Sequence, residues 1–221
     1  MTIPSISIIV CSFNHSKWIA RCVRSILNQK KLNNNDFEII LINDASTDDT
    51  LNVLSSFQNI DNLRIFSNNE NIGLPKSLNK AIKISKGRYI VRVDSDDYIS
   101  DNFLFFMKTF MDFNRHYEAI ACDYKKIDEN ENEISRHNSI KEEIACGVMF
   151  RKETLIDLGL YNEKYKMREG HELRAKFLAR KKLIGRLELP FYKYRQHDKN
   201  RTKNKKILKN YDEKLKNIIY S

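Results

Sequence analysis

The sequence has little glycine and proline and no paired cysteines, and each shortage excludes a class of protein. Six glycines and three prolines among 221 residues are too few for a collagen-like or disordered chain. The four cysteines lack the spacing of a zinc or redox site, and three lie in apolar stretches, which indicates buried free thiols in a reducing cytoplasm. Because no apolar run reaches about 18 residues and no signal-peptide pattern is present, we expect a cytoplasmic protein without a membrane span.

Hydrophobic and basic residues are both plentiful. Hydrophobic residues make up 41% of the chain and aromatic residues 10%, which is enough for one well-filled core. The 39 lysines and arginines exceed the 29 acidic residues and give a net charge of +10. This excess suggests a nucleic-acid-binding domain, but no RNA- or DNA-binding motif is recognisable. We therefore expect no nucleic-acid partner and rank that function third of three hypotheses.

The first hundred residues alternate strand and helix patterns. Apolar β-rich runs are found at residues 6–10, 37–42, 63–66 and 89–93. Amphipathic helical patterns follow the first three runs, and Leu51 and Leu54 are expected to face the core in the second helix. Strict alternation predicts right-handed βαβ units, and hence an α/β fold with a mostly parallel central sheet and helices on both faces.

The second half of the chain has a less regular pattern. Its expected elements are a phenylalanine-rich helix, strands at 119–124, 146–150 and 189–194, helices near 155–158 and from 169 to about 181, and a hairpin or loop centred on 128–132. Leu173, Phe177 and Leu178 are expected to share the buried face of the last helix. No linker separates the two halves, so residues 1–198 are expected to form one domain.

Polar segments follow three of the predicted strands. They are residues 12–14, 43–44 and 94–97. In parallel α/β sheets, ligands bind beyond the carboxyl ends of the strands. We therefore expect the three segments to converge on one edge of the sheet and to form the functional site.

Three acidic residues, Asp94, Asp96 and Asp97, fall within four positions at the end of a predicted strand. On an extended chain Asp94 and Asp96 would lie on one side about 6.5 Å apart, where their repulsion amounts to roughly 2–3 kcal/mol. A Mg²⁺ or Mn²⁺ ion that also binds a phosphate would offset this repulsion. The alternative is a solvated acidic turn or a helix N-cap.

The sequence lacks the glycine-rich phosphate loops of common nucleotide-binding folds. Residues 11–15 (CSFNH) follow the first predicted strand, without the glycines of a dinucleotide-binding fold, a P-loop or a nucleotidyltransferase. A phosphate would then be held mainly through the metal. Lys76 or Arg88 would assist as hydrogen-bond donors.

Four segments of the chain, in order, resemble the nucleotide-binding half of glycosyltransferase family 2, the inverting enzymes of the GT-A fold. The segments are residues 5–14, 41–49, 71–79 and 93–97. The resemblance extends through His197 and implies a GT-A nucleotide-diphospho-sugar transferase fold over residues 1–198. Residues 1–100 would form the nucleotide-binding half and residues 101–198 the acceptor half.

The resemblance also implies roles for residues in these loops. The residues that would contact the nucleotide base are Cys11, Ser12, Phe13 and Asp44. Asp94 would meet the ribose, and Lys76 would be the basic residue that follows the turn before the third helix. Asp44 could instead form an Asx-turn or cap the next helix, or it could serve both purposes.

By the same resemblance, Asp96 would bind the metal that bridges the diphosphate, as part of a DXD motif that begins at Asp94. Relatives often have a Tyr-Arg-x-His segment whose histidine completes the metal site, and the segment ending at His197 matches it. The expected cofactor is Mn²⁺ or Mg²⁺, and imidazole suits Mn²⁺ better. A lone exposed histidine is the alternative for His197.

The catalytic base of relatives comes from a helix-opening segment of the type Glu-Asp-x-Asp-Leu. Here the segment is EGHEL from Glu169, so glycine stands at the usual aspartate position. Glu169 is our first choice for the base, Glu172 the second and His171 the third. The alternative is that both glutamates are helix-start charges or ion-pair partners of Arg168 and Arg174.

Positive charge is concentrated after the predicted domain, where residues 199–221 are expected to form a basic amphipathic helix. One interpretation is peripheral contact with anionic lipid on the inner face of the membrane, close to lipid-linked acceptors. The other is that the apolar stripe of this helix packs on the domain or on a second subunit, which would give a homodimer.

These roles together imply a function. We expect an inverting, metal-dependent glycosyltransferase of polysaccharide biosynthesis that moves a sugar from a nucleoside diphosphate-sugar, UDP being favoured, to a hydroxyl of a saccharide or lipid-linked acceptor. The second hypothesis is a catalytically inactive nucleotide-sugar-binding module, because glycine stands at the usual base position.

Overall fold

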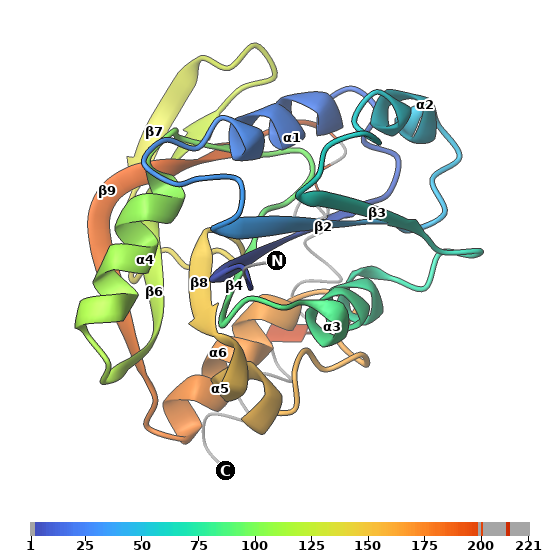
Figure 1. Ribbon diagram of the computed structural model, residues 1–221. Coiled ribbons are helices and arrows are strands. Elements are labelled where there is room, and N and C mark those ends of the chain that lie inside the picture. The colour runs from blue at the N-terminus through green and yellow to red at the C-terminus, as the bar shows by residue number, and fades with distance from the viewer. Residues whose placement is uncertain (1–2, 199, 201–210, 213–221) are drawn as a thin grey trace.

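The computed structural model describes residues 3–198, 200 and 211–212. Within this part of the chain, nine strands form one sheet (Figure 1). The strands are β1 (Ile6–Ser12), β2 (Phe37–Asn43), β3 (Leu63–Ser67), β4 (Tyr89–Arg92), β5 (Tyr98–Ile99), β6 (Tyr117–Ile127), β7 (Glu133–His137), β8 (Val148–Arg151) and β9 (Leu183–Arg195). The helices are α1 (Ile19–Leu27), α2 (Thr50–Ser55), α3 (Leu74–Ile84), α4 (Phe103–Phe113), α5 (Lys152–Asp157) and α6 (Glu169–Ala179). All strands except β7 follow the order β3-β2-β1-β4-β8-β6-β9-β5, and β7 pairs with β6.

The first half of the sheet is parallel, as its nearly continuous apolar strands predict. β1 pairs with β2 and β4, and β2 pairs with β3. Alternate side chains enter two cores, so that Ile8 packs with residues of α1 on one face and Ile9 with residues of α3 on the other. α1, α2 and α4 cover one face, and α3, α5 and α6 cover the other (Figure 1). The predicted α/β architecture is confirmed.

The second half of the sheet is mixed. β8 is antiparallel to β4 and β6, β9 is parallel to β6, and the short β5 is antiparallel to β9. β9 begins at Leu183, six residues before the predicted start at residue 189. Its pairing with β6 has several register shifts and few of its first side chains are buried, so the sequence there shows no clear apolar alternation. The predicted hairpin at residues 128–132 connects β6 and β7.

Two side chains that were predicted to face the core are exposed. Leu51 is 48% exposed and Leu178 is 59% exposed. The short helix α2 buries Thr50 and Leu54, which lie one turn apart, and this turns Leu51 outward. In α6 the inward position belongs to Phe177, so the next residue faces solvent. Both predictions were wrong.

The predicted helix over residues 199–221 lies outside the described residues, apart from Asn200, Tyr211 and Asp212. Asp212 pairs with Arg168 at 2.7 Å, and the Tyr211 ring lies 5.5 Å from the Tyr165 ring. Among the helices that the structure describes, none has the length and apolar character needed to cross a bilayer.

Candidate active site

Three loops that follow parallel strands meet at the carboxyl edge of the sheet. The Asp44 N–H donates to the Ser12 carbonyl at 2.8 Å, which joins the loops after β2 and β1. His15 Nδ1 lies 2.6 Å from the Ser95 hydroxyl, which joins the loops after β1 and β4. The predicted convergence of the three polar segments is confirmed.

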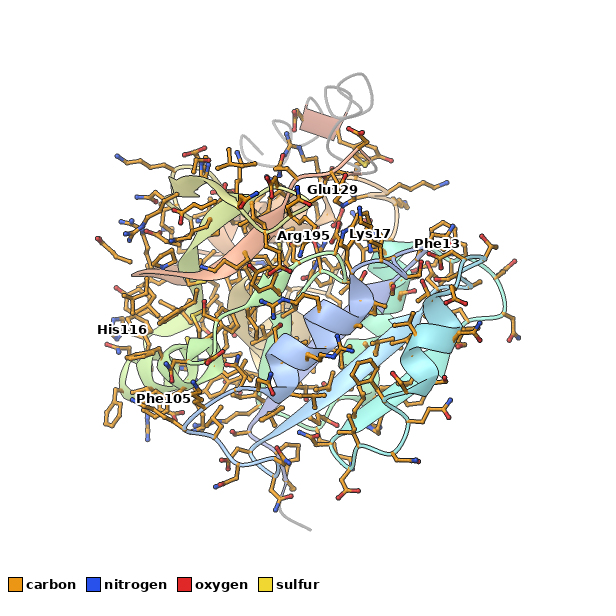
Figure 2. The ribbon with its side chains drawn as sticks, turned by 90° about the horizontal axis from the view of Figure 1, so that it is seen from above. Phe13, Lys17, Phe105, His116, Glu129 and Arg195 are labelled. Atoms are coloured by element: carbon orange, nitrogen blue, oxygen red, sulfur yellow. The ribbon has the colours of Figure 1, made fainter. Side chains whose placement is uncertain are left out.

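The hairpin between β6 and β7 closes one side of this edge. Lys17 at the start of α1 pairs with Glu129, and Arg195 at the end of β9 pairs with Glu131 at 3.1 Å. Figure 2 shows this side of the molecule, with Lys17, Glu129 and Arg195 labelled. The hairpin thus braces the end of β9 against the loop after β1.

Asp44 is buried and holds the loop that opens α3. Its carboxylate accepts hydrogen bonds from the Asn68 amide at 2.7 Å, the Ile72 N–H at 3.1 Å and the Gly73 N–H at 2.9 Å. Gly73 has a φ of +88°, a left-handed conformation that favours glycine. Asp44 therefore does not cap α2, and that alternative was wrong. It fixes the first turn of α3, on which Lys76 is exposed.

The three acids lie on a turn, whereas the sequence suggested an extended strand. β4 ends at Arg92, and the Asp97 N–H donates to the Asp94 carbonyl at 3.0 Å. Arg92 donates to both oxygens of Asp94, at 2.6 and 3.1 Å. His197 Nε2 lies 2.9 Å from Asp96 Oδ2. Asp94 and Asp96 thus have separate partners.

Asp97 is held inside the protein. Its carboxylate accepts hydrogen bonds from the Tyr192 hydroxyl and the Arg195 N–H, both at 2.8 Å. Burial and the two neighbouring carboxylates raise the pKa of Asp97 well above its usual value. Burial opposes ionisation of Asp96 as well, but the hydrogen bond with His197 lowers the Asp96 pKa. Each acid thus has a partner within the protein, but the raised pKa of Asp97 indicates that the repulsion expected from the sequence is still present at this turn.

Asp96 and His197 form the donor pair that best fits a divalent metal. His197 is 4% exposed and its ring lies 4.0 Å from the Trp18 ring, so it is not a lone exposed histidine. Within the described residues, its buried Nδ1 atom has no hydrogen-bond partner. A carboxylate oxygen and an imidazole nitrogen are suitable ligands for Mn²⁺.

A second group of ligand atoms, from Asp94, Asp97 and Cys146, lies within 4.8 Å. It fits a hard cation less well, because both oxygens of Asp97 already accept hydrogen bonds. Burial also raises the pKa of the Cys146 thiol and disfavours the thiolate that binds metals. The donor chemistry therefore favours Asp96 and His197. All four cysteines are free, as predicted.

The two glutamates at the start of α6 face different surroundings. Glu169 is 5% exposed and pairs at 2.9 Å with Arg92, the arginine that also holds Asp94. Glu172 is 1% exposed and pairs with Lys176 at 3.1 Å. The structure therefore brings Glu169 to the cluster at the sheet edge and leaves Glu172 outside it.

The charged neighbours of these glutamates have other partners. Arg168 pairs with Asp212 and Arg174 with Glu143, both at 2.7 Å. Both glutamates lie in the first turn of α6, as the helix-start alternative expected. Burial and the charge of Arg168 lower the pKa of His171 to about 4. His171 is thus neutral at pH 7 but a weak base.

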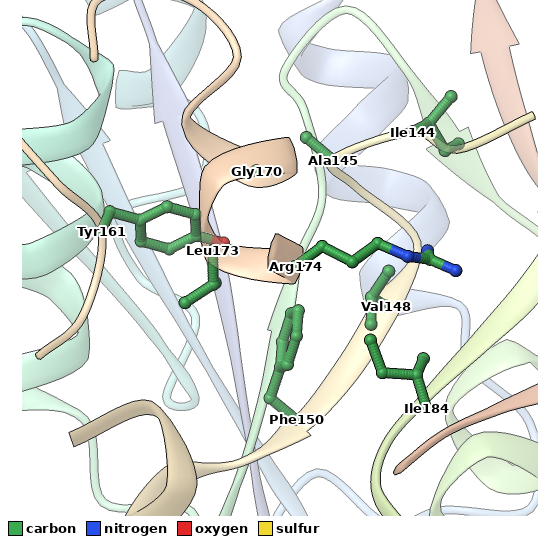
Figure 3. A pocket seen from close by; sticks show the side chains of 9 residues that line it. All are labelled: Ile144, Ala145, Val148, Phe150, Tyr161, Gly170, Leu173, Arg174 and Ile184. Atoms are coloured by element: carbon green, nitrogen blue, oxygen red, sulfur yellow. The ribbon is translucent and has the colours of Figure 1, made fainter. Parts of the chain in front are cut away.

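Gly170 has no space for a side chain. A Cβ atom there would lie 2.8 Å from the Ala145 Cα and closer still to its Cβ. Figure 3 shows Ile144 and Ala145 beside this part of α6, next to a cavity of about 10 Å³. Such a cavity has room for about one water molecule and none for a sugar. The segment at 144–145 therefore occupies the space that an aspartate side chain would need.

We expect Gly170→Ala to lower the free energy of unfolding by about 1–3 kcal/mol, because overpacking a close contact forces the backbone to shift. Urea unfolding followed by circular dichroism measures the change. Arg180→Ala, at the exposed end of the same helix, is the control and should change stability by less than about 0.5 kcal/mol. Equal stability of Gly170→Ala and the parent protein would contradict the close packing.

Arg88 lies at the other edge of the sheet. It precedes β4, pairs with Asp112 and lines a cavity of about 380 Å³ together with Arg115 and Arg151. The length of β4 separates it from the carboxyl edge. The prediction that Arg88 assists phosphate binding was therefore wrong.

Three residues of this site were not predicted to be site residues: His15, Arg92 and Tyr192. A charged residue in a buried strand signals a buried partner, so Arg92 could have been found. His15 and Tyr192 reach the acid turn only through the fold, by contacts with Ser95 and Asp97. No local pattern indicates those contacts.

The sequence matches a family model and several curated proteins. The model described as glycosyl transferase family 2 matches residues 7–182. An uncharacterized glycosyltransferase of Haemophilus influenzae is 36% identical over 129 residues, which cover 58% of this chain and 39% of the relative. A chondroitin synthase of Escherichia coli is 35% identical over 137 residues, which cover 60% of this chain and 19% of the relative. The chain spans less than half the length of either relative.

Solved structures share the fold. Staphylococcus aureus TarS (residues 1–349) in complex with UDP-GlcNAc matches with a TM-score of 0.76 and 23% identity, over 92% of this chain and 61% of that one. The mannosyltransferase PcManGT of Pyrobaculum calidifontis, in complex with GDP-Man and Mn²⁺, matches with a TM-score of 0.71 and 15% identity, over 89% of this chain and 58% of that one. The predicted GT-A fold is confirmed.

Proposed function

The chain belongs to glycosyl transferase family 2, and we propose that it transfers a sugar from a nucleoside diphosphate-sugar to a hydroxyl of a saccharide or lipid-linked acceptor, with a divalent metal and with inversion. One observation supports this most directly. The loops that bear Asp44, Asp94 and Asp96 meet at the carboxyl edge of a parallel sheet, where α/β folds bind their ligands.

We favour UDP as the nucleotide. TarS was solved with UDP-GlcNAc and PcManGT with GDP-Man, so both support a nucleoside diphosphate-sugar, and TarS supports UDP. The proposed contacts of the base are Cys11, Ser12, Phe13 and Asp44. Phe13 is 43% exposed on the rim, and the buried Ser12 hydroxyl has no hydrogen-bond partner in the described part of the chain. Phe13 is therefore accessible to a base, and the buried Ser12 hydroxyl is an unused hydrogen-bonding group.

Other residues would hold the ribose and the diphosphate. Asp94 would accept the ribose hydroxyls, and the exposed Lys76 on the first turn of α3 would contact a phosphate. Asp96 and His197 would hold the metal, for which their donor chemistry is suitable. A bound Mn²⁺ supplies positive charge that stabilises the departing nucleoside diphosphate.

Glu169 is the proposed catalytic base. It would accept the proton of the acceptor hydroxyl while that oxygen forms a bond to the anomeric carbon. The bond from the anomeric carbon to the nucleoside diphosphate breaks on the opposite face, which inverts the configuration. The ion pair with Arg92 supports this role, because a neighbouring cation favours the charged form of a buried carboxyl group.

The alternative is an inactive nucleotide-sugar-binding module. It is favoured by Gly170, which lacks a carboxylate and cannot accept one without movement of the 144–145 segment. Such a module would bind the donor in the presence of metal and would neither transfer its sugar nor hydrolyse it.

A thermal-shift panel of nucleoside diphosphates with and without Mn²⁺ tests the proposal. A ligand at a hundred times its Kd stabilises the folded state by about 2.7 kcal/mol, which corresponds to a rise in Tm of roughly 5–10 °C for a chain of this size. We expect that rise with UDP and Mn²⁺ together, and a much smaller one with uridine or with EDTA. No shift with any nucleoside diphosphate would contradict the proposed function.

A further inference from the structure

Arg92 is a buried cation that contacts both halves of the proposed site. It ends β4, and its side chain is 5% exposed. Nε and Nη2 donate to the two oxygens of Asp94 at 2.6 and 3.1 Å, while Nη1 donates to Glu169 at 2.9 Å. A two-point contact of this kind fixes orientation as well as charge. One guanidinium therefore connects the aspartate assigned to the ribose with the glutamate assigned to proton transfer.

Burial makes this connection important for the charge of Glu169. A carboxyl group as buried as Glu169 is driven toward its protonated form unless a cation lies beside it. A protonated carboxyl cannot accept the proton of an acceptor hydroxyl. Arg92 supplies the cation, but it is shared with Asp94, so one guanidinium faces two carboxylates. The placement of both carboxylates therefore depends on the same guanidinium.

We propose that Arg92 is a positioning residue that couples nucleotide binding to the catalytic base. It holds Asp94 in the orientation that meets the ribose, and it holds Glu169 beside Asp94 at the same site. This inference rests on the proposed function and adds a residue to it. Lysine cannot replace Arg92 fully, because a single ammonium group lacks the planar fork that serves two carboxylates.

The test compares Arg92→Lys with Arg64→Lys. Arg64 also forms an ion pair at 2.7 Å, with Glu38, but on the outer strand β3. Calorimetry with UDP and Mn²⁺ measures binding, and hydrolysis of UDP-GlcNAc measures turnover. For Arg92→Lys we expect the Kd of UDP to rise about tenfold and kcat to fall about a hundredfold, in the range known for misplaced catalytic groups. For Arg64→Lys we expect both to stay within about twofold.

A double variant separates positioning from a general loss of structure. If Arg92 acts on kcat through Glu169, then Arg92→Lys should cause little further loss of kcat in a Glu169→Gln background, while the Kd of UDP still rises. Losses of kcat that multiply in the double variant would overturn the inference. An unchanged kcat in Arg92→Lys would overturn it too, because Arg92 would then serve Asp94 alone.

A second pair of variants leaves Arg92 in place, in case its replacement prevents folding. Glu169→Ala removes one of the two carboxylates that Arg92 contacts and should change the Kd of UDP at least about threefold, whereas Glu169→Gln retains an acceptor oxygen and should not. Identical UDP affinities for both variants would overturn the coupling while leaving the proposed function standing. A parent protein that fails to bind UDP would overturn both.

Discussion

Replacing Asp96 with asparagine should reduce sugar transfer by about a thousandfold and leave the fold intact. Asp96 contributes a carboxylate oxygen beside the imidazole of His197, at 2.9 Å, and its charge is what a divalent cation requires. Under the proposed function, the departing diphosphate would lack its main charge partner without the cation, and loss of one such electrostatic contact typically costs about 10²–10³ in kcat. Turnover of UDP-GlcNAc over a range of Mn²⁺ concentrations measures the effect.

Asp101→Asn is the matched control for this substitution. Asp101 lies close to the acid turn in the sequence, but it forms an exposed pair with Lys30 at 2.7 Å. Exposed pairs of this kind contribute little to stability, about 0–1 kcal/mol. The control should therefore match the parent protein in Tm, in turnover and in the Mn²⁺ dependence of UDP binding. Undiminished turnover in Asp96→Asn would show that Asp96 is not a metal ligand needed for catalysis.

The parallel half of the fold could be predicted because its signals are local. Each of its strands is a short apolar run, and each helix between them shows its own apolar stripe. Both kinds of element can therefore be predicted from neighbouring residues alone. β9 could not be bounded in the same way. Its first residues, from Leu183 onward, pair with β6 through irregular register and remain half exposed. The pairing partner, and not the local pattern, makes that segment a strand.

The candidate site shows the same division between local and distant information. The order of the polar loops was visible in the sequence, and their convergence followed from the topology of a parallel sheet. The contact of Tyr192 with Asp97 was not visible, because Tyr192 lies about a hundred positions away from the acid turn. His197 is equally distant from Asp96, and only the family resemblance placed the two together.

The last prediction concerns the base, for which the sequence left three candidates. Glu169→Gln should lower kcat by about 10²–10⁴, the range for loss of a general base, and should leave the Kd of UDP nearly unchanged. The amide oxygen of glutamine can still accept the hydrogen bond from Arg92, but it cannot take up a proton. Steady-state turnover of UDP-GlcNAc and calorimetry with UDP and Mn²⁺ separate the two effects.

Glu172→Gln is the matched comparison, because it makes the same change three residues further along the same buried face of α6. Arg92 donates to Glu169, whereas Glu172 pairs with Lys176 at 3.1 Å. Its replacement should therefore lower Tm and change kcat by no more than a few-fold. A large loss of kcat in Glu172→Gln with normal turnover in Glu169→Gln would transfer the role of base to Glu172. Normal turnover in both variants would instead favour a base outside α6, since the low pKa of His171, about 4, makes it a weak substitute.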